Sequence, residues 1–174
     1  MVNNNKTYYY SGITRFYFLG KNKTTIQKYV NQFKKIWNNR NILIIEGDKT
    51  RLGFGNDLFN NAKSIKRIIC PAENAFDVYK KILNYVTNLN IDKETLILIS
   101  LGPTATVLAH DFVNLGNQVI DFGHFDIQYE YFLRNATKNI KIAYKYVNEI
   151  SEGTKNITQV TDEKYLNQII RRIN

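Results

Sequence analysis

The sequence has one cysteine, two prolines and no apolar run approaching the roughly 20 residues that a membrane-spanning helix requires. Because Cys70 stands alone, a single chain can form neither a disulfide framework nor a cysteine zinc cluster. The N-terminus, MVNNNKTYYYSGITRF, has no apolar core of signal-peptide length. These absences argue against a disulfide-rich secreted protein and against a membrane span, and we expect a soluble, cytoplasmic protein.

Acidic residues are also scarce, since 15 Asp and Glu stand against 24 Lys and Arg, for a formal net charge of +9. The basic residues are spread along the chain, and the densest clusters are pairs such as Lys34-Lys35, Lys80-Lys81 and Arg171-Arg172. Spread charge is typical of a solvated surface, so nucleic acid is not the expected partner. A nucleotide diphosphate or an anionic membrane face would suit the charge equally well.

The chain of 174 residues is long enough for one domain with an ample core, and we expect a single domain over residues 1–174. No internal repeat or low-complexity linker divides it. Residues 1–23 form an aromatic-rich start that includes Tyr8, Tyr9 and Tyr10. We expect this segment to be an ordinary edge strand, with cover for a sheet edge or a hydrophobic partner as the alternative.

Short apolar runs alternate with segments of helical periodicity, which is typical of a doubly wound α/β sheet. The expected parallel strands are Ile42 to Ile45, Ile65 to Ile69, Leu96 to Leu101 and Val119 to Ile120, with a late strand from Ile140 to Val147. The expected helices are Thr24 to Asn38, one that begins at Asn74, Thr104 to Asn114, Phe125 to Leu133 and Asp162 to Ile173. Strands that are apolar on both faces predict helices on both sides of the sheet.

The stretch from Glu94 to Glu130 predicts a βαβ unit with a polar loop after each strand. Ligands of open parallel sheets bind beyond the carboxyl ends of the strands, where helix N-termini present free amides. Gly102, Pro103 and Thr104 could therefore bind a phosphate or diphosphate. The alternative is a plain strand-to-helix turn in which Thr104 is the helix N-cap.

A second polar loop, Glu46 to Asp57, directly follows a buried strand and is rich in glycine and charge. Binding groups are often carried on loops that a rigid sheet holds in place. Arg51 could bind a phosphate or carboxylate through its planar guanidinium. Alternatively, Glu46 or Asp48 pairs with Arg51 and only orders the loop.

Several motifs in order resemble the GT-D fold glycosyltransferases, a bacterial family of sugar transferases. The motifs are Ile44-Ile45-Glu46-Gly47, Arg51-Leu52-Gly53-Phe54-Gly55-Asn56-Asp57-Leu58-Phe59, Ser64-Ile65-Lys66-Arg67-Ile68, Leu101-Gly102-Pro103-Thr104-Ala105-Thr106, Asp121-Phe122-Gly123-His124-Phe125-Asp126 and Lys145-Tyr146-Val147-Asn148-Glu149. The similarity extends from about Ile13 onward. It implies a Rossmann-like parallel sheet with helices on both faces, a nucleotide-sugar donor (typically a UDP-hexose), a divalent metal such as Mn²⁺ or Mg²⁺, and a glycan or glycoprotein acceptor.

The chain departs from the family's pattern at one point. Family members carry an acidic Asp-x-Glu motif, within a string like Arg-x-Gly-Asp-Gly-Glu, that binds the metal and the diphosphate, and residues 1–23 contain no substitute for it. Glu46-Gly47-Asp48 belongs to a different motif. We therefore expect the chain to represent the family without its N-terminal portion, and another chain is a possible source of the missing motif.

The resemblance implies roles for residues at the carboxyl edge of the sheet. The donor-binding candidates are Arg51, Gly53, Gly55, Asn56, Asp57, Gly102, Pro103 and Thr104. His124 and Asp126 are candidates for the catalytic base or for metal ligands, and a histidine bound to a backbone carbonyl in a turn is the alternative for His124. Glu130, one helical turn beyond Asp126, either shares its face or is exposed to solvent. We expect Arg51, the turn at Thr104 and His124 to line one cleft.

Two functions from different classes fit these features. One is a glycosyltransferase that uses a nucleotide-sugar donor and is incomplete without the acidic motif. The other is a non-catalytic module that keeps the fold and binds a nucleotide sugar or another chain.

Overall fold

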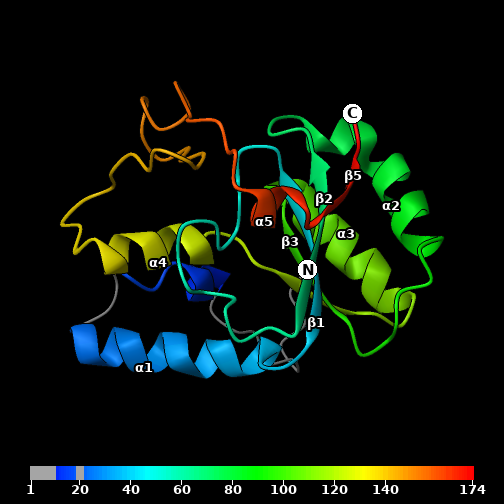
Figure 1. Ribbon diagram of the computed structural model, residues 1–174, viewed down its shortest axis with the longest axis horizontal. Helices are drawn as coiled ribbons and strands as arrows, with labels where there is room; N and C mark the ends of the chain where they lie inside the picture. Colours follow the sequence, from blue (N-terminus) through cyan, green and yellow to red (C-terminus); the bar gives the residue numbers. More distant parts are fainter. Residues whose placement is uncertain (1–10, 19–21) are drawn as a thin grey trace, which may run out of the picture.

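The computed structural model describes residues 11–18 and 22–174, and Tyr8, Tyr9 and Tyr10 lie outside them. A five-stranded sheet, all of whose pairings are parallel, forms its centre in the order β4-β3-β1-β2-β5 (Figure 1). The strands are β1 (Asn41–Gly47), β2 (Ser64–Cys70), β3 (Leu96–Ser100), β4 (Gln118–Asp121) and β5 (Ile169–Arg172). The four predicted parallel strands and the α/β fold class are thus confirmed.

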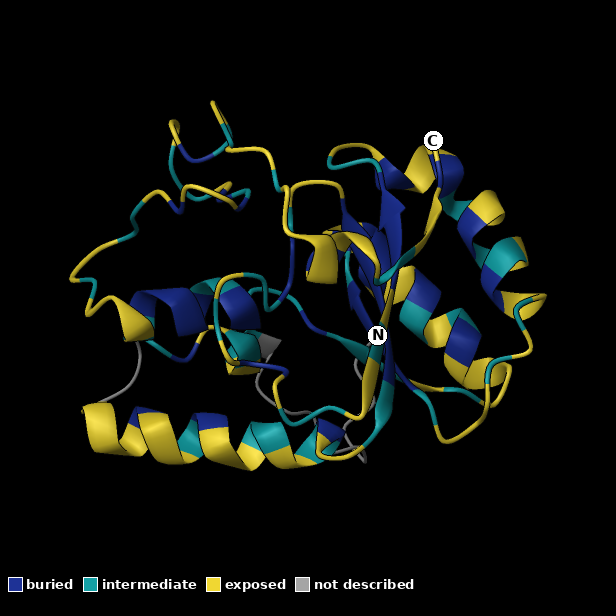
Figure 2. Ribbon diagram, viewed as in Figure 1, coloured by how far each residue is buried: buried dark blue, intermediate teal, exposed yellow. Residues whose placement is uncertain are grey.

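The central strand β1 is buried on both faces because its apolar side chains alternate between two cores (Figure 2). Leu43 and Ile45 pack into the cluster that α2 and α3 cover, whereas Ile42 and Ile44 pack into the cluster that includes residues of α1 and α4. Figure 1 shows the two pairs of helices on opposite sides of the sheet. The predicted helices on both faces are therefore present.

The helical segments match most of the predicted periodicity. They are η1 (Ser11–Thr14), α1 (Lys23–Lys34), η2 (Lys35–Trp37), η3 (Ala75–Val78), α2 (Tyr79–Thr87), α3 (Pro103–Asn114), α4 (Phe125–Leu133) and α5 (Glu163–Leu166). Asn22 caps α1 by accepting a hydrogen bond from the Thr25 amide at 2.9 Å. None of the helices in the described ranges is long and apolar enough to cross a bilayer.

The predicted helix from Asp162 to Ile173 is wrong beyond its first turn. Helix α5 ends at Leu166, and Ile169–Arg172 instead forms β5 beside β2. The amide of Arg67 donates to Gln168 O at 2.7 Å, and the amide of Ile173 donates to Ile69 O at 2.8 Å. The free edge of β2 offers backbone donors and acceptors that need partners, and this demand outweighs the helical spacing of Tyr165 and Ile169.

The predicted strand from Ile140 to Val147 is also absent, because this segment has no regular secondary structure. Its alternating apolar residues suggest a strand, but Ile142 and Val147 pack with Tyr131 of α4 in a small separate core. The Tyr146 amide donates to Lys49 O at 2.8 Å, so the segment lies against the loop after β1 rather than beside a sheet edge. Side-chain contacts with α4 and that loop decide its path.

Candidate functional site

A cleft of about 1110 Å³ lies at the carboxyl edge of the sheet. Strand β2 pairs with one edge of β1, and β3, the next strand in the sequence, pairs with the opposite edge of β1. The strand order therefore reverses at β1. Open α/β sheets bind ligands at such a reversal. The lining comes from the loops after four strands and includes Gly47, Thr50, Ala72, Phe76, Ser100, Gly102, Pro103, Thr104, Asp121 and His124.

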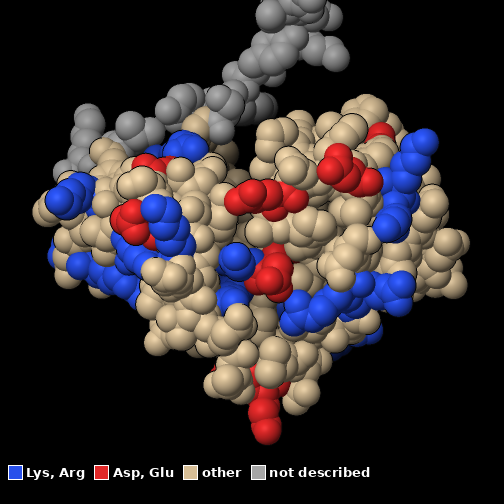
Figure 3. Space-filling model, turned by 90° about the horizontal axis from the view of Figure 1, so that it is seen from above, with Lys and Arg blue, Asp and Glu red and all other residues tan. Residues whose placement is uncertain are grey.

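The cleft is more acidic than the chain as a whole. Its described lining holds Glu73, Asp121, Asp126 and Glu149, against the single guanidinium of Arg15. Viewed from above, Figure 3 shows carboxylates near the middle of the molecular face and many of the lysines and arginines toward its sides. The net charge of +9 therefore does not describe the charge at the cleft.

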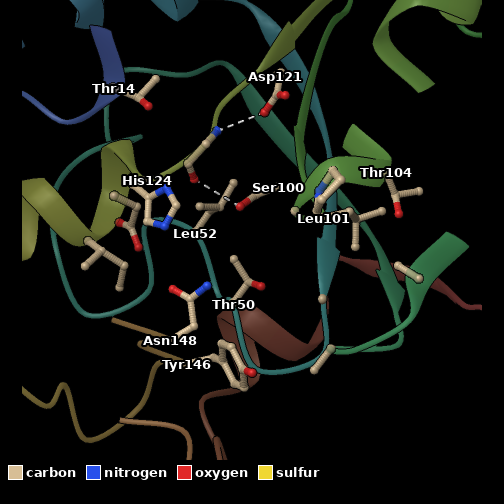
Figure 4. Close-up of a pocket in the computed structure, with 18 of the residues that line it drawn as sticks. Thr14, Thr50, Leu52, Ser100, Leu101, Thr104, Asp121, His124, Tyr146 and Asn148 are labelled. Atoms are coloured by element: carbon tan, nitrogen blue, oxygen red, sulfur yellow. Dashed lines mark hydrogen bonds between the residues drawn. The ribbon is translucent and has the colours of Figure 1, made fainter. Parts of the chain in front are cut away.

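The N-terminus of α3 forms one wall. Gly102 has φ 54° and ψ −142°, a combination that residues with a Cβ rarely adopt, and Pro103 occupies the first helical turn, where a missing amide is tolerated. Thr104 is buried and lines the cleft, opposite His124 in Figure 4. The helix therefore directs first-turn amides toward the carboxyl edge, as an anion would require.

The turn between β4 and α4 is held by its own hydrogen bonds (Figure 4). The Gly123 amide donates to Asp121 Oδ1 at 3.2 Å, and Ser100 Oγ donates to Gly123 O at 3.3 Å. Thr106 Oγ1 donates to the other oxygen of Asp121 at 2.8 Å. These contacts fix the backbone immediately before His124, which is the residue preceding α4.

His124 faces the cleft and contacts two charged residues. Its Nε2 lies 3.0 Å from Arg15 Nη2 and 3.6 Å from Glu149 Oε1. Burial lowers the pKa of His124 below its ordinary value of 6.5, the Arg15 charge lowers it further, and Glu149, a hydrogen bond with Asn148 and Asp121 oppose the change. The imidazole is therefore neutral at pH 7, with Nε2 accepting the hydrogen bond from Arg15.

This geometry predicts a titration of His124 with its midpoint below pH 6.5. The unfolded chain binds this proton more readily, so the contribution of His124 to stability is present above about pH 6.5 and is lost as the pH falls through the lowered pKa. NMR of the imidazole signals measures the midpoint, and a His110→Gln variant assigns the two histidines. Glu149→Gln should lower the midpoint further. A midpoint at or above 6.5 would contradict this description of the site.

Asp126 lines the cleft but is already occupied by protein groups. Its Oδ1 accepts from the Gly53 amide at 3.0 Å and from Asn56 Nδ2 at 2.9 Å, and its Oδ2 accepts from Lys145 Nζ at 2.6 Å. Glu130 Oε1 accepts from the same Lys145 and Asn56 groups, both at 2.7 Å, so the two acids do share a face. This arrangement favours a structural role for Asp126, since its carboxylate joins α4 to the loop after β1.

Arg51 does not line the cleft, so the expectation that it does so with Thr104 and His124 is wrong. Its side chain is buried, and Nη1 donates to Tyr144 O at 2.7 Å and to Thr158 O at 2.6 Å. Residues 134–162 contain no helix or strand and form an irregular segment, whose carbonyls thus bind the guanidinium. Arg51 pairs with neither Glu46 nor Asp48, because Glu46 pairs with Arg67 at 2.6 Å and Asp48 with Arg172 at 3.0 Å.

The remaining candidates in this loop also lie outside the lining of the cleft. Gly55 is not among the residues described there, and Asp57 accepts from Tyr129 OH at 2.5 Å and from Lys34 Nζ at 2.7 Å. Gly53 has φ 70°, and a Cβ at this position would clash with the Phe59 ring. Gly53, Asn56 and Asp57 therefore serve the packing of the loop against α1 and α4.

Two segments far apart in the sequence complete the cleft walls. Ile13, Thr14 and Arg15 line it from the N-terminal segment, and Tyr146, Asn148 and Glu149 line it from the irregular segment. The similarity of Lys145-Tyr146-Val147-Asn148-Glu149 to a family motif was the one sequence signal for the second group. No sequence signal indicated Arg15, since its segment was expected to be an edge strand.

The residues that the structure describes offer neither a set of metal ligands nor a reactive thiol. Within residues 11–18 and 22–174, no three His, Cys, Asp or Glu side chains are grouped so that they could hold a metal ion. His124 and Asp126 thus have no third partner for a metal among those residues. Burial and the nearby Glu46 carboxylate raise the pKa of Cys70 to about 12, so its thiol is not a nucleophile at neutral pH.

Two named relatives are similar to this chain over most of its length. The glycosyltransferase GlyD of Streptococcus pneumoniae serotype 4 (strain ATCC BAA-334 / TIGR4) is 38% identical over 161 residues, which are 92% of this chain and 19% of that protein. The probable glycosyl transferase Gly of Streptococcus gordonii is 39% identical over 161 residues, which are 92% of this chain and 23% of that protein. The chain thus spans about a fifth of the length of each relative.

Solved structures show the same fold. The structure described as "The highly conserved domain of unknown function 1792 has a distinct glycosyltransferase fold" matches with a TM-score of 0.87 and 38% identity, over 94% of this chain and 58% of that one. "A New Glycosyltransferase (DUF1792) from Streptococcus sanguinis" matches with a TM-score of 0.87 and 38% identity, over 94% of this chain and 60% of that one. The family model "Glycosyltransferase GT-D fold" matches residues 1–150. The chain therefore belongs to the GT-D fold glycosyltransferase family.

Proposed function

We propose that this chain takes part in transferring a hexose from a nucleotide sugar, with UDP as the nucleotide, to a hydroxyl group of a glycan or glycoprotein. The observation that carries the proposal is the cleft of about 1110 Å³ at the reversal of strand order, with the α3 N-terminus on one wall and a neutral histidine on the other. A nucleotide sugar fits a cleft of this size. Membership of the family supplies the reaction class.

The donor's diphosphate is placed at the α3 N-terminus in this proposal. Gly102 keeps the turn free of a Cβ, and nothing lies within 4 Å of where one would be, so a ligand can approach the backbone closely. The first-turn amides and the helix dipole favour the negative charge that grows on the diphosphate as it leaves. Pro103 and Thr104 shape this turn rather than supplying charge.

His124 is the proposed general base on the opposite wall. The acceptor hydroxyl oxygen attacks the anomeric carbon, the bond to the diphosphate oxygen breaks, and the hydroxyl proton passes to Nε2, the unprotonated imidazole nitrogen, once Arg15 no longer donates to it. The neutral form that this role requires is the form that burial and Arg15 favour. Asp126 contributes indirectly, because it holds the first turn of α4 against Gly53 and Lys145.

The divalent cation that the resemblance implies has no set of three ligands among the residues described. Residues 1–10 and 19–21 contain no Asp or Glu, so we propose that another chain supplies the carboxylates that hold any Mn²⁺ or Mg²⁺. The same observation favours a second candidate function, a non-catalytic module that binds a nucleotide sugar or a partner chain.

A panel of UDP-hexoses, incubated with the chain with and without Mn²⁺, separates the two functions. We expect slow release of UDP from at least one donor, since metal chemistry normally supplies much of the stabilisation of a leaving diphosphate. His124→Ala should reduce this release at least tenfold. His110→Ala is the matched control, because His110 is an exposed histidine of α3 outside the cleft lining, and it should change nothing.

Release that persists in His124→Ala would remove His124 from the reaction. Binding of UDP without any release, on every donor tested, would favour the binding module over the enzyme.

A further inference from the structure

The cleft has a single source of positive charge among its described lining residues, and this is Arg15 rather than the predicted Arg51. Lys145, which is not among the residues that line the cleft, neutralises Asp126. Within residues 11–18 and 22–174, Glu73 and Asp121 form no ion pair. A nucleotide diphosphate that enters the cleft therefore meets repulsion from these two carboxylates, and Arg15 is the side chain that can offset it.

The backbone directly after Arg15 is anchored to α4, the helix that begins next to His124. Phe16 is buried, and its ring centroid lies 4.8 Å from Phe125 of α4 and 5.2 Å from Tyr29 of α1. The Tyr17 amide donates to Gln128 Oε1 of α4 at 2.9 Å. The guanidinium is thus delivered to the mouth of the cleft from a fixed base, although it belongs to no strand of the sheet.

The guanidinium is oriented yet has donors to spare. Its Nη1 donates to Glu149 Oε1 at 2.5 Å, and Nη2 donates to His124 Nε2 at 3.0 Å. A guanidinium has five N–H donors, so these two contacts leave three, and the side chain is 49% exposed. The planar fork of arginine suits the oxygens of a phosphate.

We propose that Arg15 binds the diphosphate of the donor from the wall opposite the α3 N-terminus, and that Glu149 competes with the diphosphate for the guanidinium. This assignment rests on the proposed use of a nucleotide-sugar donor. It makes Glu149 a restraint on Arg15 before the diphosphate binds. The assignment also explains why an acidic cleft can accept an anion.

Calorimetric titration with UDP and with inorganic pyrophosphate tests the assignment, with and without Mg²⁺. Arg15→Gln should weaken the binding of both probes by a similar factor of about 10 to 100, the typical range for a hydrogen bond to a charged group. Glu149→Gln should strengthen both by up to about fivefold, because the competing charge is gone. Arg15→Lys, which keeps the charge but not the fork, should fall between Arg15→Gln and the unmodified chain.

The opposite signs distinguish this role from a purely structural ion pair. If Arg15 and Glu149 only fasten the N-terminal segment to the irregular segment, both variants should weaken binding together, and that result would overturn the proposal. Arg172→Gln is the matched control, because Arg172 also forms an exposed ion pair, at 3.0 Å with Asp48, and lies outside the cleft lining. It should bind both probes as the unmodified chain does.

Two further results would count against the proposal in distinguishable ways. Equal affinities of Arg15→Gln and the unmodified chain would overturn the role of Arg15 and leave the proposed function standing. If the unmodified chain bound neither probe, both the proposed donor site and the role of Arg15 would be overturned. Thermal unfolding followed by circular dichroism shows whether each variant is folded, and Arg15→Lys retains the test if Arg15→Gln is not.

Discussion

Replacing Lys145 with methionine is expected to lower the free energy of unfolding by about 3–5 kcal/mol, a large part of the 5–15 kcal/mol that typically stabilises a domain. Lys145 is fully buried, and its ammonium donates to Asp126 Oδ2 at 2.6 Å and to Glu130 Oε1 at 2.7 Å. Both carboxylates are buried as well. Without the ammonium, Arg134, which contacts Glu130, is the cation left for two buried negative charges. Urea unfolding followed by circular dichroism measures the loss.

Lys155→Met is the matched control for this variant. Lys155 also pairs with a carboxylate, Glu152 at 3.0 Å, but both side chains are more than 60% exposed. Exposed pairs of this kind contribute between 0 and about 1 kcal/mol. If Lys145→Met cost no more than Lys155→Met, the buried network would not be holding the irregular segment to α4.

Replacing Arg67 with methionine is expected to cost a similar amount, about 3–5 kcal/mol, at the other buried network. Arg67 of β2 donates to Glu46 Oε1 at 2.6 Å, to Leu52 O at 2.9 Å and to Gln168 Oε1 at 2.7 Å. It also lies over the Tyr165 ring, 4.5 Å from the centroid. The variant leaves the Glu46 carboxylate fully buried without its cation. Chemical unfolding in urea again gives the change.

Adding Glu46→Gln to Arg67→Met should recover part of that loss. A glutamine can still accept the hydrogen bond that Glu46 Oε2 takes from the Leu52 amide at 2.6 Å, and its amide group can donate to Tyr165 OH, which lies 3.1 Å from Oε1. It carries no charge. Arg172→Met, on the neighbouring strand β5, is the control, because its pair with Asp48 is exposed. A double variant as unstable as the sum of the two single variants would show that no buried charge had been left unpaired.

The Lys145 network, together with the buried Arg51, also explains how the cleft keeps its shape. Residues 134–162 contain no helix or strand, yet Tyr146, Asn148 and Glu149 of this segment form part of the cleft wall. Lys145 ties the segment to α4, and Arg51 holds the carbonyls of Tyr144 and Thr158. Arg51 thus acts on the site by positioning its wall, a role that its place in a polar loop did not reveal.

Local patterns in the sequence were sufficient for strands β1 to β4 and for bringing two of the predicted turns to one cleft. The apolar runs that became β1 and β3 are buried on both sides, and Val119 and Ile120 of the edge strand β4 are partly buried against the two cores. Their hydrophobicity therefore predicted parallel strands between helices. Parallel strands bring their following loops to one edge, which placed the turn at Thr104 and the turn at His124 at one cleft without any coordinates. The order of motifs was enough to indicate the family.

Only the tertiary structure decided which charged side chains face the cleft. A local pattern shows whether a side chain can be buried, but the partner of a charge depends on segments far away in the chain. Arg51 and Arg15 illustrate this, since carbonyls more than 90 residues away hold Arg51 in the interior, whereas packing of Phe16 on α4 brings Arg15 to the cleft. Strand β5 likewise depends on a distant segment. Its sequence has helical spacing, but its backbone is extended because it pairs with the open edge of β2.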